Sequence, residues 1–393
     1  MTGNEILEML KERFAAMSGS GEVRIFFAPG RVNLIGEHTD YNGGHVFPCA
    51  LSLGTYAAVR LREDRKIRMA SLNIMDGKVT ETSLDDLVYR EEADWTNYPK
   101  GVIWAFEEEG MRLPSGMDIL YYGNIPAGAG LSSSASLEVL TGLVLKTLFG
   151  FDDLDMVKVA LLGQRAENGF VGMNCGIMDQ FASAMGKEGH AIFLDTNTLT
   201  FEYAPMTLKN QHIVITNSNV KHTLASSAYN TRRAESEEGL KRLQEVKDIR
   251  TLGDLTNEAF AEIQNVIGDD VILRRARHAV SENIRTIEAS VALKAGDIVR
   301  FGKLMNDSHV SMRDDYEISC EEIDFLVEKA WELDGVVGSR MTGGGFGGCT
   351  VSIVREDAIP SFEETLTAAY RQRFGKAAEY YVIDPGAGAH EIR

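Results

Sequence analysis

Apolar residues recur with helical spacing in some segments of the chain and alternate with polar residues in others. The helical spacing predicts several helices. The first twenty residues carry charged side chains at helical spacing, which predicts an N-terminal helix. After residue 132, apolar residues at spacings of three and four define one buried face of a helix, formed by Leu137, Leu140, Val144 and Leu148. Further helical patterns cover residues 153–168, 231–247 and 271–295.

Shorter apolar runs predict strands. Residues 23–28 form an apolar run that ends at Pro29-Gly30, which is the pattern of a strand that enters a loop. Cys349, Val351 and Ile353 alternate with polar residues, which is typical of a half-buried strand. Other strands are expected within residues 46–61, 119–125, 191–194 and 213–216.

The order of these elements indicates an α+β fold. Strands and helices are mixed irregularly, without the regular strand–helix–strand alternation that builds a parallel sheet. At 393 residues the chain is long for one core, and a norm of about 150 residues per domain predicts two domains. We place the boundary between the strands at 191–194 and 213–216, so that the domains are residues 1–205 and 206–393.

Composition argues against two classes of partner. The chain has 58 acidic and 40 basic residues and a formal net charge of −18. This balance opposes binding to nucleic acid or to an anionic membrane, and the densest basic segment, residues 60–68, also contains Glu63 and Asp64. The richest apolar stretch, residues 139–149, contains Lys146 and is too short to span a bilayer.

Cysteine usage and the N-terminus indicate the compartment. The four cysteines stand far apart and form no CxxC pair, which argues against a zinc site and against a disulfide framework. No apolar core of the signal-peptide type follows the charged N-terminal residues. The sequence therefore predicts a cytoplasmic protein.

Residues 30–44 contain the first group of candidate functional residues. Glu37, His38 and Asp40 place several hydrogen-bonding groups between glycines, which suits a small ligand with many hydroxyls. A metal site is the weaker alternative, because the nearest other histidine, His45, follows a double-glycine turn. A turn whose polar side chains cap its own backbone is a second alternative.

Residues 128–138 read Gly-Ala-Gly-Leu-Ser-Ser-Ser-Ala-Ser-Leu-Glu and run directly into a predicted helix. The glycines let the backbone approach a charged ligand, and the start of the helix adds amide groups and the positive end of its dipole. No lysine follows as in a Walker P-loop, and the GxGxxG pattern is absent. We interpret the segment as a phosphate-binding loop, with a plain turn and serine caps as the alternative.

Two further segments have candidate roles. Asp179 follows Gly176-Ile177-Met178 among apolar residues, so its carboxylate would be partly desolvated and would need a cation, for which Arg31 is the candidate. The alternative for Asp179 is a helix cap. Five glycines within residues 343–348 indicate either a lid on the substrate side or a tight crossing of two backbone segments.

In this order, the motifs resemble those of the GHMP small-molecule kinases. Residues 30–44 match the signature of the branch that phosphorylates galactose, residues 128–138 match the ATP motif, and residues 343–348 match the C-terminal motif. The similarity continues through residues 313–317 and covers nearly the whole length. It implies two domains, an N-terminal ribosomal-protein-S5-domain-2-like domain and a C-terminal ferredoxin-like domain, with the active site in the cleft between them.

The resemblance also implies an activity and a set of site residues. The activity is ATP-dependent phosphorylation of the C1 hydroxyl of galactose, the first committed step of galactose catabolism, by a monomer. Asp179 would be the catalytic base and Arg31 its electrostatic partner. Mg²⁺ would be bound by Ser134 and Glu167, which are hard oxygen ligands for a hard cation. The sugar would be bound by Glu37, His38, Thr39, Asp40 and Tyr229. Nucleotide-binding roles fall to Ser71, Gly128, Ala129, Gly130, Leu131, Ser132, Ser133 and Ser134.

Two other functions stay open at this point. A related kinase that acts on N-acetylgalactosamine or arabinose would share these motifs, because the width of the pocket at C2 is not readable from the sequence. A non-catalytic sugar sensor of similar sequence would lack residues of the Gly/Ser loop. Here Ser132-Ser133-Ser134-Ala135 is uninterrupted and both Arg31 and Asp179 are present, so catalysis is favoured.

Overall fold

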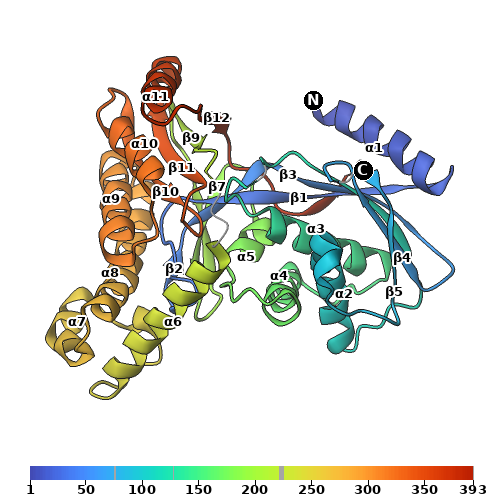
Figure 1. The fold of residues 1–393 in the computed structure, drawn as a ribbon, viewed down its shortest axis with the longest axis horizontal. Helices are drawn as coiled ribbons and strands as arrows, with labels where there is room; N and C mark the ends of the chain where they lie inside the picture. Colours follow the sequence, from blue (N-terminus) through green and yellow to red (C-terminus); the bar gives the residue numbers. More distant parts are fainter. Residues whose placement is uncertain (75–76, 127, 221–224, 393) are drawn as a thin grey trace.

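The computed structural model describes residues 1–74, 77–126, 128–220 and 225–392, and a six-stranded sheet forms the centre of its first half (Figure 1). The strand order is β13-β1-β3-β6-β4-β5, and of these neighbours β4 and β6 run parallel while the others are antiparallel. The strands are β1 (Arg24–Asn33), β3 (Pro48–Leu61), β4 (Lys66–Ser71), β5 (Thr80–Ser83), β6 (Met117–Gly123) and β13 (His390–Ile392).

Helices cover both faces of this sheet. On one face lies α1 (Gly3–Ser18), which starts at a Thr2 capping box and packs Leu10 and Phe14 against Ile25 and Leu120. Figure 1 shows the other helices of this half on the opposite face. They are α2 (Asn97–Glu108), α3 (Ser133–Leu148), α4 (Met156–Ala166) and α5 (Met178–Met185), with the short 3-10 turn η2 (Glu91–Thr96) before α2 and the π-helical turn η3 (Glu167–Val171) after α4.

The second half is built on a four-stranded antiparallel sheet of order β10-β11-β9-β12. Its strands are β9 (Gln211–Asn217), β10 (Val336–Thr342), β11 (Cys349–Arg355) and β12 (Glu379–Ile383). Its helices are α6 (Ala225–Gln244), α7 (Asn257–Ile263), α8 (Asp270–Lys294), α9 (Ile298–Ser311), α10 (Glu321–Trp331) and α11 (Ile359–Phe374), joined by η4 (Leu252–Asp254), η5 (Gln264–Ile267), the π-helical turn η6 (Met312–Tyr316) and η7 (Glu356–Ala358). Strand, helices, two strands, helix and strand follow one another as in a ferredoxin-like unit.

The two halves share one apolar core. Val32 and Phe47 from the first half pack in the same cluster as Ile213, Leu304 and Val351 from the second. A three-stranded sheet joins β2 (His45–Val46), which stands between β1 and β3 in the sequence, with β7 (His190–Asp195) and β8 (Phe201–Pro205), which precede β9. Strand β13, near the end of the second half, returns to pair with β1. The α+β class is confirmed, while the domain boundary at residue 205 stays a prediction.

Three local predictions differ from the structure. The strand at 23–28 does not end at Pro29-Gly30, because β1 continues to Asn33 across a register shift that accommodates the proline. Helix α3 is buried on nearly all sides rather than on one face, since neighbouring helices and the sheet enclose it. Strand β11 is buried on both faces, and its Ser352 hydroxyl finds a partner at 2.8 Å in the hydroxyl of Ser339.

Candidate active site

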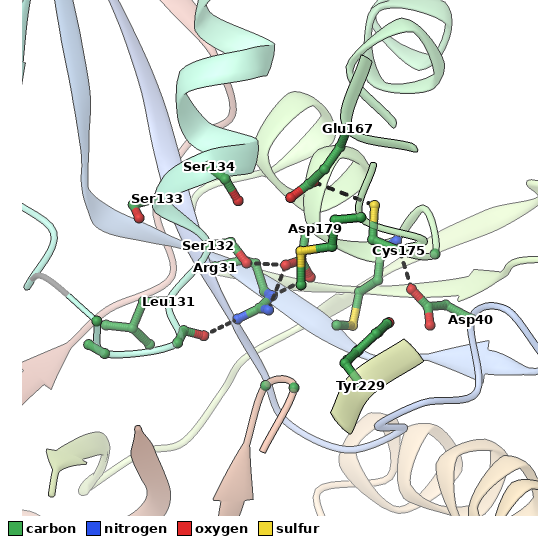
Figure 2. A pocket seen from close by; sticks show the side chains of 18 of the residues that line it. Arg31, Asp40, Leu131, Ser132, Ser133, Ser134, Glu167, Cys175, Asp179 and Tyr229 are labelled. Atoms are coloured by element: carbon green, nitrogen blue, oxygen red, sulfur yellow. Dashed lines mark hydrogen bonds and ion pairs between the residues drawn. The ribbon is translucent and has the colours of Figure 1, made fainter. Parts of the chain in front are cut away.

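A pocket lies where the four candidate motifs meet (Figure 2). The first motif contributes Arg31, His38 and Asp40, and the glycine-rich loop contributes Gly343 and Gly344. The other lining residues of the predicted site are Gly128, Ala129, Gly130, Leu131, Ser132, Ser133, Ser134, Glu167, Asp179 and Tyr229. Segments that are more than three hundred residues apart in the sequence therefore form one site.

Arg31 and Asp179 form the ion pair at the centre of the pocket. Nε and Nη2 of Arg31 each lie 2.7 Å from a different carboxylate oxygen of Asp179, and Nη1 donates to the carbonyl of Gly130 at 2.7 Å. Burial disfavours the Arg31 charge, but Asp179 outweighs this effect and raises the pKa of Arg31. The Arg31 side chain is only 4% exposed, whereas that of Asp179 is 29% exposed and faces the pocket.

Asp179 is not a helix cap. Ile177 occupies the N-cap position of α5, without a side-chain hydrogen bond to the helix, and Asp179 lies in the first turn. Its carboxylate instead accepts hydrogen bonds from Arg31 and from the hydroxyl of Ser132. The cation that the sequence analysis assigned to Asp179 is therefore the observed partner, and the alternative of a helix cap is wrong.

The Gly/Ser loop leaves the start of α3 without a side-chain cap. Ser132 occupies the N-cap position with a left-handed φ of 60°, and its hydroxyl points to Asp179 rather than to the helix amides. The alternative of serine caps in a plain turn is therefore wrong at this position. The uncapped amides of a 16-residue helix face the pocket beside Ser133 and Ser134, which is a favourable place for an anion.

Asp40, His38 and Tyr229 lie on the opposite side of the pocket from the Gly/Ser loop. The Asp40 carboxylate accepts from the backbone amide of Met178 at 3.3 Å and lies so close to Gly176 that a Cβ there would meet it at 2.0 Å. Burial, and then the charge of Asp179, raise the pKa of Asp40 to about 6. The rings of His38 and Tyr229 are 4.9 Å apart.

Glu37 and Thr39 lie behind this wall instead of lining the pocket. The Glu37 carboxylate pairs with Arg340 and accepts from Asn33 and from the amide of Gly343, both at 3.0 Å. The Thr39 hydroxyl lies 2.8 Å from the carbonyl of Gly36 and 2.6 Å from that of His45. As the turn alternative expects, Thr39 and Asn42 bond to the backbone of their own turn, with Asn42 Nδ2 donating to the carbonyl of His38 at 2.7 Å, whereas the Glu37 carboxylate does not.

Glu167 and Ser134 face each other at the end of the pocket next to the Gly/Ser loop (Figure 2). Burial followed by the charge of Asp179 raises the pKa of Glu167 to about 7, and the Ser134 hydroxyl acts in the opposite direction. Behind Glu167, Gln180 Nε2 donates to Glu167 at 2.7 Å and to the fully buried Glu138 at 2.9 Å. Burial and the charge of Glu167 raise the pKa of Glu138 well above its usual range.

This oxygen-rich corner fits a hard cation only in part. One oxygen of Glu138 is buried without a hydrogen-bond partner, and both carboxylates lack a cationic partner within hydrogen-bonding distance in the described part of the chain. No group of three or more His, Cys, Asp or Glu residues among those that the structure describes is arranged as a metal cage. A cation here would therefore depend on ligand oxygens, as Mg²⁺ does when it binds with phosphates.

Ser71 is the one predicted nucleotide contact that lies outside the described lining of the pocket. It ends β4, is 6% exposed, and its hydroxyl accepts from the amide of Asn73 at 3.2 Å. The glycine-rich loop is a tight crossing of two backbone segments, and its role as a lid stays a prediction. Gly343 and Gly344 line the pocket, and Gly343, with a φ of 87°, approaches so closely that a Cβ would meet the carbonyl of Gly130 at 2.9 Å.

Sequence reasoning missed Arg340, Glu138 and Gln180. All three are fully buried; Arg340 pairs with Glu37, and Gln180 links Glu138 to Glu167. For Arg340 and Glu138, a charged residue in an otherwise apolar strand or helix was the available signal, since such residues are rarely buried without a partner. The partner itself lies too far along the chain to be read from spacing.

Comparisons with known proteins agree with this geometry. Residues 12–61 match the galactokinase galactose-binding signature, residues 97–187 match the N-terminal domain of GHMP kinases and residues 289–372 match their C-terminal domain. A galactokinase of Clostridium beijerinckii is 52% identical over 99% of this chain and 100% of its own length, and one of Bacillus subtilis is 50% identical over 98% and 99%.

A solved structure is also similar. The crystal structure of Lactococcus lactis galactokinase complexed with galactose has a TM-score of 0.96 and 44% sequence identity, and covers 98% of this chain and 100% of that one. Among the residues that the structure describes, no helix is long and apolar enough to cross a membrane. The chain belongs to the galactokinase family of the GHMP kinases.

Proposed function

We propose that this protein transfers the terminal phosphoryl group of ATP to the C1 hydroxyl of galactose. The observation that carries the proposal is the partly exposed carboxylate of Asp179, held by Arg31 between the Gly/Ser loop and the Asp40 side of one pocket. Phosphoryl transfer needs little from a protein beyond positioning, charge stabilisation and a proton acceptor, and this arrangement offers all three.

Asp179 is the residue that would take the proton. As the C1 oxygen forms its bond to the terminal phosphorus, the bond from that phosphorus to the bridging oxygen breaks, and ADP leaves with the electron pair. The proton of the C1 hydroxyl passes to Asp179. Arg31 keeps Asp179 oriented through two hydrogen bonds and places a positive charge near the transferred group.

The Gly/Ser loop supports binding of the phosphates. Loop residues 128–134 line the pocket next to Asp179, and the uncapped start of α3 adds free amides and a positive dipole end. The nucleotide role of Ser71 stays a prediction.

Mg²⁺ is the cation that this corner suits best when phosphates are bound. Ser134 and Glu167 would hold it, and it would neutralise phosphate charge during transfer. Their position opposite each other (Figure 2) and the carboxylates of Glu167 and Glu138, which have no cationic partner in the described part of the chain, support this choice. Gln180 would keep Glu167 oriented toward the phosphates.

On the sugar side, Asp40, His38 and Tyr229 offer a carboxylate and two rings to a ligand rich in hydroxyls. Sugar-binding roles for Glu37 and Thr39 stay predictions.

We further propose that the enzyme acts as a monomer, as the resemblance of its motifs to those of the family implies. Light scattering at working concentration measures this, and a dimer would contradict it.

A sugar panel tests the proposed function. Coupled ADP release is measured with galactose, N-acetylgalactosamine, glucose and arabinose, with sugar omitted as the background. We expect ADP with galactose at the highest kcat/KM. A galactose analogue without the C1 hydroxyl should compete with galactose but release no ADP. Absence of ADP with every sugar would overturn the kinase function, and a faster N-acetylgalactosamine or arabinose reaction would reassign the substrate.

A further inference from the structure

His38 stands between two polar partners that come from different parts of the chain. Its Nε2 lies 3.2 Å from the carbonyl oxygen of Gly344, and its Nδ1 lies 2.6 Å from the hydroxyl of Tyr41. That hydroxyl is in turn 2.8 Å from the hydroxyl of Tyr316, which is fully buried at the end of η6. The three side chains form a continuous hydrogen-bonded chain that ends at the glycine-rich loop.

The carbonyl of Gly344, at one end of this series of hydrogen bonds, fixes the direction of each of them. A carbonyl oxygen only accepts, so Nε2 of His38 has to bear a hydrogen. In a neutral imidazole Nδ1 is then an acceptor, which makes Tyr41 the donor. The Tyr41 oxygen is therefore free to accept from Tyr316. Another acceptor within reach of Tyr316 is the carbonyl of Arg232, at a longer 3.4 Å.

The surroundings keep this imidazole neutral. His38 is 4% exposed, and burial, followed by the neighbouring His278, lowers its pKa to about 3. Arg232 also lowers this pKa, while the carbonyl of Gly344 and the more distant Glu282 act in the opposite direction.

His38 also has a left-handed backbone φ of 60°, which is uncommon for a residue other than glycine. Such a conformation persists only when the surroundings determine it. The ring is fixed on several sides, since its centroid lies 4.9 Å from that of Tyr229 and 5.0 Å from that of Tyr316. The side chain is therefore held in one orientation at the pocket wall.

We propose that Tyr41 and Tyr316 are positioning residues that hold His38 as its Nε2–H tautomer and thereby join the sugar-side wall of the pocket to Gly344. Neither tyrosine is among the described lining residues, so both act through His38. The role for catalysis rests on the proposed function, because it assigns the sugar to the wall that His38 and Asp40 form. The tautomer itself does not depend on that assignment.

The tautomer can be read directly in the unmodified protein. With ¹⁵N-labelled histidine, long-range proton–nitrogen NMR spectra separate a protonated from a bare ring nitrogen, and loss of one signal set in His38→Asn assigns the residue. We expect Nε2 of His38 to be protonated and Nδ1 bare at pH 7.5. A proton on Nδ1 would overturn the proposal without any variant having to fold.

Variants then test the two tyrosines. Tyr41→Phe should shift the Nδ1 resonance of His38 and raise KM for galactose about tenfold, the equivalent of one lost hydrogen bond at the upper end of its usual value, with kcat little changed. Tyr316→Phe should have a smaller effect, about threefold, because Tyr41 can still donate to His38. KM for ATP should stay at the wild-type value in both.

Tyr370→Phe is the matched control. Tyr370 is also fully buried, and its hydroxyl donates to the carbonyl of Ser218 at 2.9 Å, outside the pocket lining. It should lower stability without changing the His38 resonances or KM for galactose. Unchanged resonances and KM in Tyr41→Phe, or an equal rise of KM for ATP, would overturn the proposal. A wild-type protein that binds no galactose would instead refute the proposed function, while the NMR result would still decide the tautomer.

Discussion

Arg31 and Arg340 each pair with a carboxylate from a distant part of the chain, but the two pairs differ in what else surrounds them. Arg31 and Asp179 lie at the pocket, and the Asp179 side chain is 29% exposed. Arg340 and Glu37 lie behind the pocket wall, with side chains 0% and 1% exposed. Glu37 also accepts from Asn33, Thr342 and the amide of Gly343.

The difference separates a reactive pair from a structural one. Glu37 has protein donors at both carboxylate oxygens, so its hydrogen-bonding capacity is largely used within the protein. Both oxygens of Asp179 also accept hydrogen bonds, from Arg31 and Ser132, but its side chain is 29% exposed and faces the pocket, so a ligand proton can reach it. Burying a pair of charges is costly, and the open pair retains a group that can react.

Replacement of Asp179, the accessible carboxylate of the two pairs, should have the largest effect on turnover. Asp179→Asn keeps the shape and removes the proton acceptor, so we expect kcat to fall by about 10² to 10⁴-fold, while galactose binding survives. Coupled ADP release and galactose calorimetry measure the two quantities. Asp155→Asn, at the exposed N-cap of α4 where asparagine is equally suitable, is the control. A loss below tenfold in Asp179→Asn would remove this residue from the role of base.

Replacement of Arg340 should disrupt the buried pair with Glu37 and lower the unfolding free energy. Arg340→Met leaves Glu37 buried without its cation, and removal of one partner of a buried pair costs about 3–5 kcal/mol of unfolding free energy. Urea denaturation measures this loss. Arg355→Met, which breaks an exposed pair with Asp334, should cost only about 0–1 kcal/mol. Equal losses in the two variants would mean that the Arg340 pair contributes no more than a surface pair.

The pH dependence of stability provides a further test of the buried Glu37 region, because His278 contacts Glu37. Its Nε2 lies 3.2 Å from the carbonyl of Glu37, and burial lowers its pKa to about 4. The unfolded chain, with a histidine pKa of about 6.5, then binds more protons than the folded chain between pH 6.5 and 4. His278 therefore contributes stability above pH 6.5 that is lost as the pH falls through this window.

The measurement is the slope of unfolding free energy against pH for wild type and His278→Gln. Asp40 and Glu167 have raised pKa values and act in the opposite direction, so the wild-type slope is a sum. The difference between the two proteins isolates His278 and should reach about 1.4 kcal/mol per pH unit within the window. The exposed His390→Gln should leave the slope unchanged. Parallel slopes for wild type and His278→Gln would show that His278 is not buried as a neutral group.

The sequence could predict the features that depend on a local pattern, but not those that depend on distant neighbours. Local patterns predicted α1, the helix after the Gly/Ser loop and the pair of Arg31 and Asp179, because each depends on spacing or on one obvious charge requirement. The burial of β11 on both faces was not predictable, since the alternation of its residues is the same whether Ser352 meets water or Ser339.

The site was predictable as a set of motifs but not as a set of contacts. The sequence analysis assigned Glu37 and Asp40 to the same binding site. In the structure Asp40 lines the pocket, whereas Glu37, three residues earlier in the same turn, lies behind the pocket wall. Arg340, 303 residues from Glu37, gave no spacing signal at all. Such long-range pairs are set by how the halves pack, and a single sequence does not encode that packing in any local pattern.

Replacement of Ser134 should have the smallest effect of these variants, because Ser134 lines the pocket but belongs to neither ion pair. Its side chain lies opposite the Glu167 carboxylate (Figure 2), and Ser134→Ala removes its hydroxyl while it leaves Arg31 and Asp179 in place. We expect the Mg²⁺ or ATP concentration for half-maximal rate to rise by about twofold to tenfold, the usual value of one hydrogen bond, with KM for galactose unchanged. Ser133→Ala, at the same loop but without this contact to Glu167, is the matched control for loop disturbance. Unchanged dependence on Mg²⁺ in Ser134→Ala would argue against Ser134 as a ligand and leave Glu167 with Gln180 as the side chains that define this corner.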